Sequence, residues 1–194
     1  MLVANIWVMM APGRREQTHA RLLACALDLF EQQGFDQTTV AQIARAAGVT
    51  EMTVFRHFPT KEGLLLDDPY DPVMAVSVAA QPRSLSPLAR AVAGIRHAWR
   101  QLPQPESQTV RRRVRVAAAS PSVRAGIAAN NGRTEHLLAE QLIADGADPL
   151  PARVAAAAVM AGITAALLEW SQHEQTTLAD AVDAALDTLD TVRG

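Results

Sequence analysis

The chain has 194 residues, of which 49% are hydrophobic, 20% charged and 4% aromatic. Alanine occurs 37 times, and because alanine favours helix over strand, this composition predicts an all-α protein. The net charge of −2 gives no global sign of nucleic-acid binding, and the single cysteine, Cys25, excludes an internal disulfide or a CxxC metal site.

The chain begins with a short apolar run over residues 1–11, followed by the basic pair Arg14 and Arg15. A secretory signal would carry its basic residues first, and the run is too short to span a bilayer. The best later apolar stretch is bracketed by Arg153 and Glu169. We therefore expect a cytoplasmic protein without a membrane partner, with a disordered tail over 1–13.

Apolar residues recur at helical spacing along the rest of the chain, and no stretch alternates for long enough to predict a strand. Gly34 and Gly48 are expected to end the first two helices. Pro69 and Pro72 are expected to break a fourth helix early, and 130–132 to interrupt the seventh. The nine expected helices lie at about 15–33, 40–47, 51–58, just after Thr60, 88–102, 110–117, 123–142, 159–170 and 178–189.

Charge falls into blocks along the chain. Residues 14–63 are neutral overall, 83–133 carry a net charge of +9, and 134–194 carry −8. Such blocks indicate regions with different structural roles. The run 111–115 contains four arginines, which on a helix point in different directions and cannot all serve one face. They are either solvated or paired with the acidic residues of 134–194, or one or two of them line a pocket for an anionic ligand.

Residues 39–58 predict two short helices joined by a tight turn at Gly48, the geometry of a helix-turn-helix. Thr39 and Gln42 form a capping-box pattern, and Thr50 can cap the second helix. Val54, Phe55 and Phe58 are expected to anchor that helix to the scaffold. Hydroxyl, arginine and histidine side chains then point outward, which suits contacts with base edges and phosphates.

This segment resembles the N-terminal domain of the TetR family of bacterial repressors. The resemblance rests on Gly34-Phe35, Thr38-Thr39-Val40, Ile43-Ala44, Ala47-Gly48-Val49-Thr50, Phe55-Arg56-His57-Phe58 and Lys61-Glu62. It covers about 15–65, and one departure is Phe55, where the family usually has a tyrosine whose hydroxyl touches a phosphate. An ordinary helical hairpin is the alternative.

The resemblance, together with the chemistry of the side chains, implies a set of DNA-contacting residues. Thr39, His57 and Lys61 are expected at phosphates, and an arm carrying Arg14 and Arg15 either reaches the DNA or is solvated. Five residues are expected to face outward on the second helix of the motif, which would enter the major groove: Thr50, Glu51, Met52, Thr53 and Arg56. All of them except the acidic Glu51 are expected to contact bases.

The resemblance further implies a DNA-binding domain over 1–65 and a ligand-binding and dimerisation domain over 66–194. The last two helices are expected to form a homodimer. Candidate effector-binding residues are Met74, Trp99 and Arg115, although Trp99 is most simply explained as core. The basic block and a weak resemblance to acyl-coenzyme A-responsive members suggest an anionic effector.

Together these patterns predict a ligand-released homodimeric repressor that binds an inverted-repeat operator in double-stranded DNA. The alternative is a constitutive or architectural DNA-binding protein without an effector. No nucleophile–base pair or phosphate loop points to an enzyme, no cofactor is expected, and the five histidines lack metal-ligand spacing.

Overall fold

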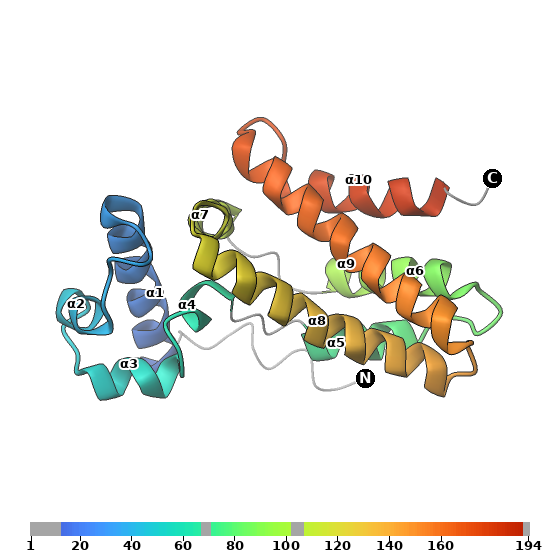
Figure 1. Cartoon of the computed structure of the whole chain (residues 1–194), viewed down its shortest axis with the longest axis horizontal. Coiled ribbons are helices and arrows are strands. Elements are labelled where there is room, and N and C mark those ends of the chain that lie inside the picture. Colours follow the sequence, from blue (N-terminus) through green and yellow to red (C-terminus); the bar gives the residue numbers. More distant parts are fainter. Residues whose placement is uncertain (1–12, 67–70, 102–106, 192–194) are drawn as a thin grey trace. The chain divides into compact units, whose positions relative to one another are not determined.

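The computed structural model describes residues 13–66, 71–101 and 107–191. Regular structure in these ranges is entirely helical, so the predicted all-α class is confirmed (Figure 1). The chain divides between Leu64 and Leu65 into two compact units. The expected disordered tail lies outside the described residues, apart from Gly13.

The N-terminal unit contains α1 (Arg14–Gln33), α2 (Val40–Ala46) and α3 (Glu51–His57), and α4 (Gly63–Leu66) crosses the boundary. Gly34 ends α1 with φ at +86°, a left-handed value that favours glycine. One core joins the three helices, because each of them contributes fully buried apolar side chains. These core residues are Leu22, Ala26, Leu27, Phe30, Phe35, Ile43, Ala44, Ala47, Val54 and Phe58.

The second unit contains α5 (Asp71–Ala79), α6 (Pro87–Gln101), α7 (Ser107–Ala119), α8 (Pro121–Ala144), α9 (Pro149–Gln172) and α10 (Leu178–Asp190). Helix α9 contacts α6, α7, α8 and α10, and it therefore forms the centre of this unit (Figure 1). Its buried residues Ala152, Ala156, Val159 and Trp170 belong to a core that all of these helices except α7 share.

Helix α5 was not predicted from the sequence. Pro72 was interpreted as a helix breaker, but it occupies the first turn of α5, where the missing N–H breaks no helical bond. The helix is held by its packing on α6, because a Cβ added to Gly94 would lie 2.5 Å from the Cα of Val78. Glycine at this position lets the two helices cross closely.

The expected interruption of the seventh helix at 130–132 was also wrong, because α8 runs unbroken from Pro121 to Ala144. Asn131 donates a side-chain hydrogen bond to Thr164 of α9 at 2.9 Å. Thr134 and Leu138, which follow directly, are fully buried. Packing against α9 therefore overrides the low helix propensity of this stretch.

The basic and acidic blocks of the sequence pair with each other within the second unit. Arg96 of α6 binds both Asp183 and Asp187 of α10, at 3.1 and 2.8 Å. Arg83 and Arg90 both bind Asp145, at 2.7 and 2.5 Å. Several cations of the +9 block therefore have carboxylate partners inside the fold.

Candidate nucleic-acid interface

Helices α2 and α3 are each started by a threonine cap, as the sequence predicted. The hydroxyl of Thr39 accepts from the backbone N–H of Gln42 at 3.2 Å, and the Gln42 side chain accepts from the N–H of Thr39 at 2.8 Å. Gly48, between the helices, has φ at +64°. The hydroxyl of Thr50 then accepts from the N–H of Thr53 at 3.2 Å. These local bonds fix where α3 begins and how sharply the chain turns before it.

One side of α3 is anchored in the core of the N-terminal unit. Val54 and Phe58 are almost completely buried, one helical turn apart. The prediction that Phe55 is a third anchor was wrong, because this side chain is 44% exposed. Adjacent residues on a helix are rotated by about 100°, so Phe55 cannot share the inward direction of Val54.

The other side of α3 carries the predicted contact residues. Glu51, Met52 and Arg56 are exposed, as is the cap residue Thr50, and Met52 is 74% exposed. Thr53 and His57 are half-buried. The six side chains thus lie on or beside the solvent face of one short helix, whose opposite side is fixed by Val54 and Phe58.

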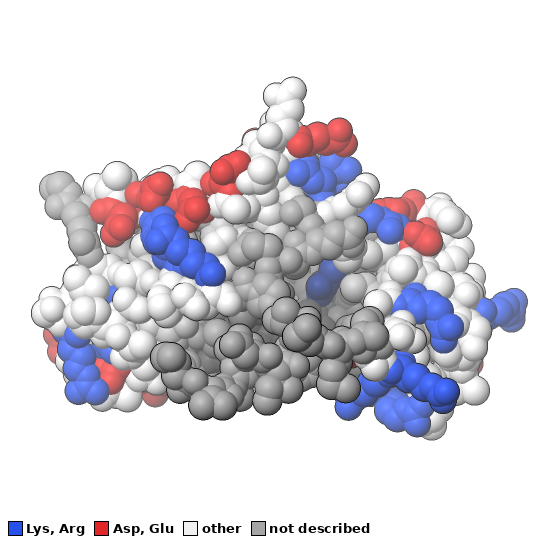
Figure 2. All heavy atoms as spheres, turned by 180° about the vertical axis from the view of Figure 1, so that it is seen from behind, with Lys and Arg blue, Asp and Glu red and all other residues white. Residues whose placement is uncertain are grey.

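The electrostatic environment of His57 is set by α1 as well as α3. Partial burial, followed by the positive charges of Arg15 and Arg56, lowers the pKa of His57 from its ordinary value of 6.5. The His57 ring centroid lies 6.0 Å from that of His19, which itself packs on Phe58. Figure 2 shows basic side chains gathered at the α3 end of this unit, at the lower right. An anion placed there would meet several cationic groups.

Lys61 occupies a position that the sequence did not indicate. Its ammonium donates to the backbone carbonyls of Phe35 and Thr38 at 2.9 and 3.0 Å. It also lies 4.2 Å from the centre of the Phe35 ring. The Thr38 hydroxyl in turn donates to the Gly34 carbonyl at 2.8 Å. Two of the three ammonium protons therefore hold the α1–α2 turn, directly before the Thr39 cap.

The predicted effector residues lie in the second unit, where each of them contacts other parts of the fold. Met74 and Trp99 are half-buried and pack against the core of the second unit. The guanidinium of Arg115 donates to the Ser171 carbonyl at 2.6 Å and lies 3.8 Å from Glu174. Arg115 thus contacts the C-terminal end of α9.

A second arginine of α7 holds the same end of α9. Arg111 donates to the carbonyls of Trp170 and Thr176, both at 3.2 Å, and to that of His173. Its guanidinium also lies 4.3 Å from the centre of the Trp170 ring. The last carbonyls of a helix have no partner within it and carry partial negative charge, so arginines are suited to this end. Of the alternatives open for this run, pairing with the acidic third holds for Arg115, which lies near Glu174, while Arg111 binds backbone carbonyls of the same third.

Two family models match the chain. Residues 22–67 match the model described as "Bacterial regulatory proteins, tetR family", and residues 86–194 match the "MftR C-terminal domain". Among curated proteins, the chain is 37% identical over 83 residues to the HTH-type transcriptional regulator TcmR of Streptomyces glaucescens. That match covers 40% of this chain and 37% of TcmR.

Solved structures extend the likeness to most of the chain. NalD, the secondary repressor of the MexAB-OprM multidrug efflux pump in Pseudomonas aeruginosa, is 24% identical with a TM-score of 0.59, covering 91% of this chain and 96% of NalD. The complex of SmeT with triclosan is 18% identical with a TM-score of 0.60, covering 91% of each chain. At these identities the likeness concerns the fold. With the two family models and the geometry of α2 and α3, the chain belongs to the TetR family of bacterial transcriptional regulators.

Proposed function

We propose that the protein is a homodimeric repressor that inserts α3 into the DNA major groove at each half of an inverted repeat, and that a small molecule releases it. The observation that carries the DNA-binding part is the solvent face of α3, where polar and cationic side chains stand opposite two buried anchors. A helix presented in this way by a tight turn has the geometry of major-groove recognition.

The residues on this surface divide by chemistry into two groups. Thr39 at the start of α2 and His57 at the end of α3 contact phosphates, and Lys61 supports them by holding the turn before Thr39. The face of α3 reads bases: Arg56 suits guanine, and methyl groups of threonine or methionine suit thymine. The base-reading face comprises Thr50, Met52, Thr53 and Arg56, with Glu51 beside it.

Dimerisation through α9 and α10 is supported by an exposed apolar stripe on α9. Six apolar residues recur every three or four positions on its solvent side, so they share one face. Two of them, Leu150 and Val154, are 73% and 58% exposed. A second copy of the chain covering this stripe would bury it and place two α3 helices on one operator. The stripe consists of Leu150, Val154, Ala157, Ala161, Ala165 and Leu168.

Among the described helices, α9 alone is long and apolar enough to cross a membrane by length and composition. This helix includes Arg153 and Glu169, which bracket its uninterrupted apolar stretch. Only 28% of its most apolar 18-residue window is buried within the chain. In the proposed dimer a second copy of the chain covers this exposed apolar surface. The small side chains of α9 permit the close helix approach that such a contact requires.

DNA binding is tested on the region upstream of the protein's own gene, at two salt concentrations. We expect a specific complex on an inverted repeat with two chains, or a multiple of two, which weakens steeply with salt. Arg56→Ala and Lys61→Ala should both weaken binding, and only Arg56→Ala should relax sequence preference, by about 1–3 kcal/mol at one base pair. Parental affinity in both variants would refute the assigned contact surface.

The dimer is tested by Ala161→Glu, which places a charge in the middle of the stripe. Light scattering during gel filtration should find two chains for the parent and one for the variant, with operator affinity lost in parallel. Ala128→Glu, at an exposed alanine of α8, is the matched control and should stay dimeric. A dimeric Ala161→Glu protein would contradict the assignment of this face.

Ligand release is tested by adding acyl-coenzyme A and a panel of other small molecules to the operator complex. A ligand changes DNA affinity only through unequal affinity for the two states, and typical coupling of about 1–3 kcal/mol gives a 5–150-fold effect. Release by no compound would favour the alternative, a constitutive or architectural DNA-binding protein.

A further inference from the structure

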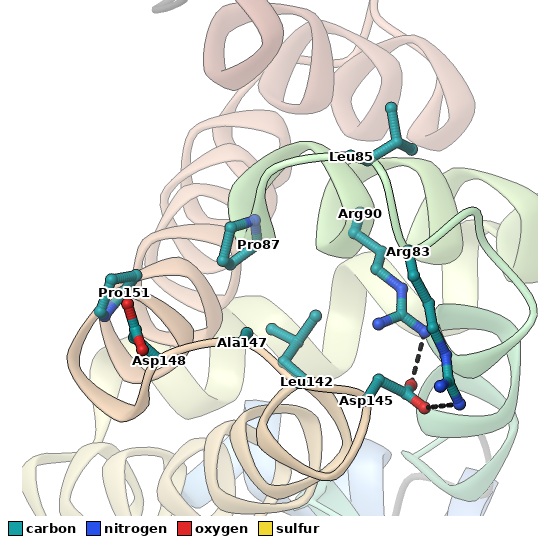
Figure 3. A pocket seen from close by; sticks show the side chains of 10 residues that line it. Arg83, Leu85, Pro87, Arg90, Leu142, Asp145, Ala147, Asp148 and Pro151 are labelled. Atoms are coloured by element: carbon teal, nitrogen blue, oxygen red, sulfur yellow. Dashed lines mark hydrogen bonds and ion pairs between the residues drawn. The ribbon is translucent and has the colours of Figure 1, made fainter.

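A pocket of about 320 Å³ lies in the second unit, between the start of α6, the end of α8 and the start of α9 (Figure 3). Met74, Trp99 and Arg115 do not line it, so it is separate from the effector site expected from the sequence. Its volume is at the lower end of the range for small-molecule sites, about 300–1,000 Å³.

The polar element of the pocket is a deeply buried guanidinium. The side chain of Arg90 is 4% exposed. Its Nε donates to the Gln81 carbonyl at 3.2 Å, and Nη2 donates to the Ala79 carbonyl at 3.1 Å and to Asp145 at 2.5 Å. These bonds fix the plane of the guanidinium, so the direction of its remaining nitrogen is determined.

That remaining nitrogen, Nη1 of Arg90, has no hydrogen-bond partner among the residues that the structure describes. No buried side-chain nitrogen or oxygen in the same residues lacks a partner, so Nη1 is open to the pocket rather than sealed. Figure 3 shows it on the side that faces Leu142, Ala147 and Pro87, away from Asp145. The pocket thus contains two fixed N–H donors that point into its space.

Two arginines and two aspartates line the pocket, namely Arg83, Arg90, Asp145 and Asp148. Asp145 is held ionised, because hydrogen bonds from Gln141 and Arg90, together with the charges of Arg90 and Arg83, lower its pKa. Its single negative charge is shared by two guanidinium groups, Arg83 and Arg90. These three groups together carry one positive charge, and the exposed Asp148, which also lines the pocket, balances it.

The rest of the wall is more polar than apolar, and its apolar part is a small patch. Leu142 and Ala147 contribute hydrocarbon from the end of α8 and the loop after it, and Pro87 and Pro151 lie in the first turns of α6 and α9. Prolines have no backbone N–H, so at these two positions the helix starts offer the pocket no donor. A fitting ligand therefore has an acceptor group for Arg90 and an apolar part small enough for this patch.

We propose that this pocket binds a small carboxylic acid, with the carboxylate on Nη1 of Arg90 and the hydrocarbon against Leu142, Ala147 and the two prolines. A carboxylate oxygen can accept from Nη1, and the bond is charge-assisted. The proposal concerns binding to the free protein and does not depend on the proposed function in DNA binding.

The probe is benzoate, titrated into the full chain at constant ionic strength and followed by calorimetry, with benzamide as the neutral isostere. Ala147→Phe should fill the pocket and weaken benzoate binding at least tenfold. Ala144→Phe, at an exposed α8 residue outside the lining, is the matched control and should bind like the parent. Pro151→Trp, at the exposed rim, provides a second block if Ala147→Phe does not fold.

Saturable benzoate binding that both blocking variants lose and Ala144→Phe keeps, with benzamide much weaker, would establish the site. Absence of saturable binding to the parent would overturn the proposal, as would equal binding in the parent and a folded blocking variant. Benzamide binding as tightly as benzoate would overturn the carboxylate assignment. Operator release by benzoate, measured separately, tells whether the site also acts on DNA binding.

Discussion

Replacing Lys61 by methionine removes the ammonium but keeps most of the side chain's length. Hydrogen bonds to a charged group contribute about 1.5–3 kcal/mol each, and a cation–π contact about 0.5–1 kcal/mol. Lys61 makes two such bonds and one such contact, but it is half-exposed. Allowing for solvent, we expect Lys61→Met to destabilise the α1–α2 turn by about 2 kcal/mol.

Hydrogen exchange measures this loss locally. A change of about 2 kcal/mol corresponds to roughly 30-fold faster exchange of the amides in 34–58, if they exchange by opening of the N-terminal unit. Operator affinity should fall as well, because the misplaced turn no longer presents Thr39. The dependence of affinity on salt should be unchanged, since the lost ammonium is bound to protein carbonyls and not to a phosphate.

Arg56→Met is the matched control, because it removes an exposed cation from α3. Because Arg56 is proposed to read a base, its loss should relax sequence preference by about 1–3 kcal/mol at one base pair, with exchange in 34–58 unaltered. A residue that contacts a phosphate would instead contribute about 0.9 to the slope of log K against log salt. The reasoning would be refuted if Lys61→Met itself lowered the slope by about 0.9 and left exchange at the parental rate. Lys61 would then be a phosphate ligand, as first expected from the sequence.

Thr50→Ala should lower the free energy of unfolding by about 1 kcal/mol through loss of the α3 cap, measured by the same exchange experiment, whereas Thr50→Ser should not. Phe55→Tyr should leave stability unchanged, because the ring edge is exposed, and should raise operator affinity about tenfold if the hydroxyl reaches a phosphate; weaker binding would contradict this. Operator affinity should rise as pH falls from 7 to 5.5, because a phosphate favours protonated His57 whereas Arg15 and Arg56 disfavour it in the free protein. His57→Gln should remove this dependence, measured by fluorescence anisotropy. The stability of the free protein should change in the opposite direction. Because the pKa of His57 is lower in the folded than in the unfolded chain, its full contribution to stability is present above pH 6.5, the ordinary pKa of histidine, and is lost as pH falls below that value.

The helix-turn-helix could be predicted because its signals are local. Thr39, Gln42 and Thr50 form caps within four residues of their partners, and Gly48 supplies the positive φ that the turn requires. Phe55 was misassigned because an apolar residue between two anchors looks like a third anchor. Only the rotation per residue along α3, seen in the structure, separates its direction from theirs.

What could not be predicted depends on partners distant in sequence. Arg111 binds carbonyls 59–65 residues away, and Arg90 meets Asp145 across 55 residues. No spacing rule connects such positions, so the arginine run was open to several interpretations. The continuity of α8 depends likewise on Asn131 reaching Thr164 in another helix. Contacts between distant helices therefore determine these features, and local helix propensity does not predict them.

The pairing of the basic block with the acidic block has a consequence for the order of synthesis. Residues 83–133, with a net charge of +9, leave the ribosome before residues 134–194, with −8. Until Asp145, Asp183 and Asp187 emerge, Arg83, Arg90 and Arg96 have none of the carboxylate partners they hold in the finished fold. A chain synthesised only as far as residue 133 therefore carries these arginines without their carboxylate partners, and this part of the second unit cannot close until the acidic third has been made.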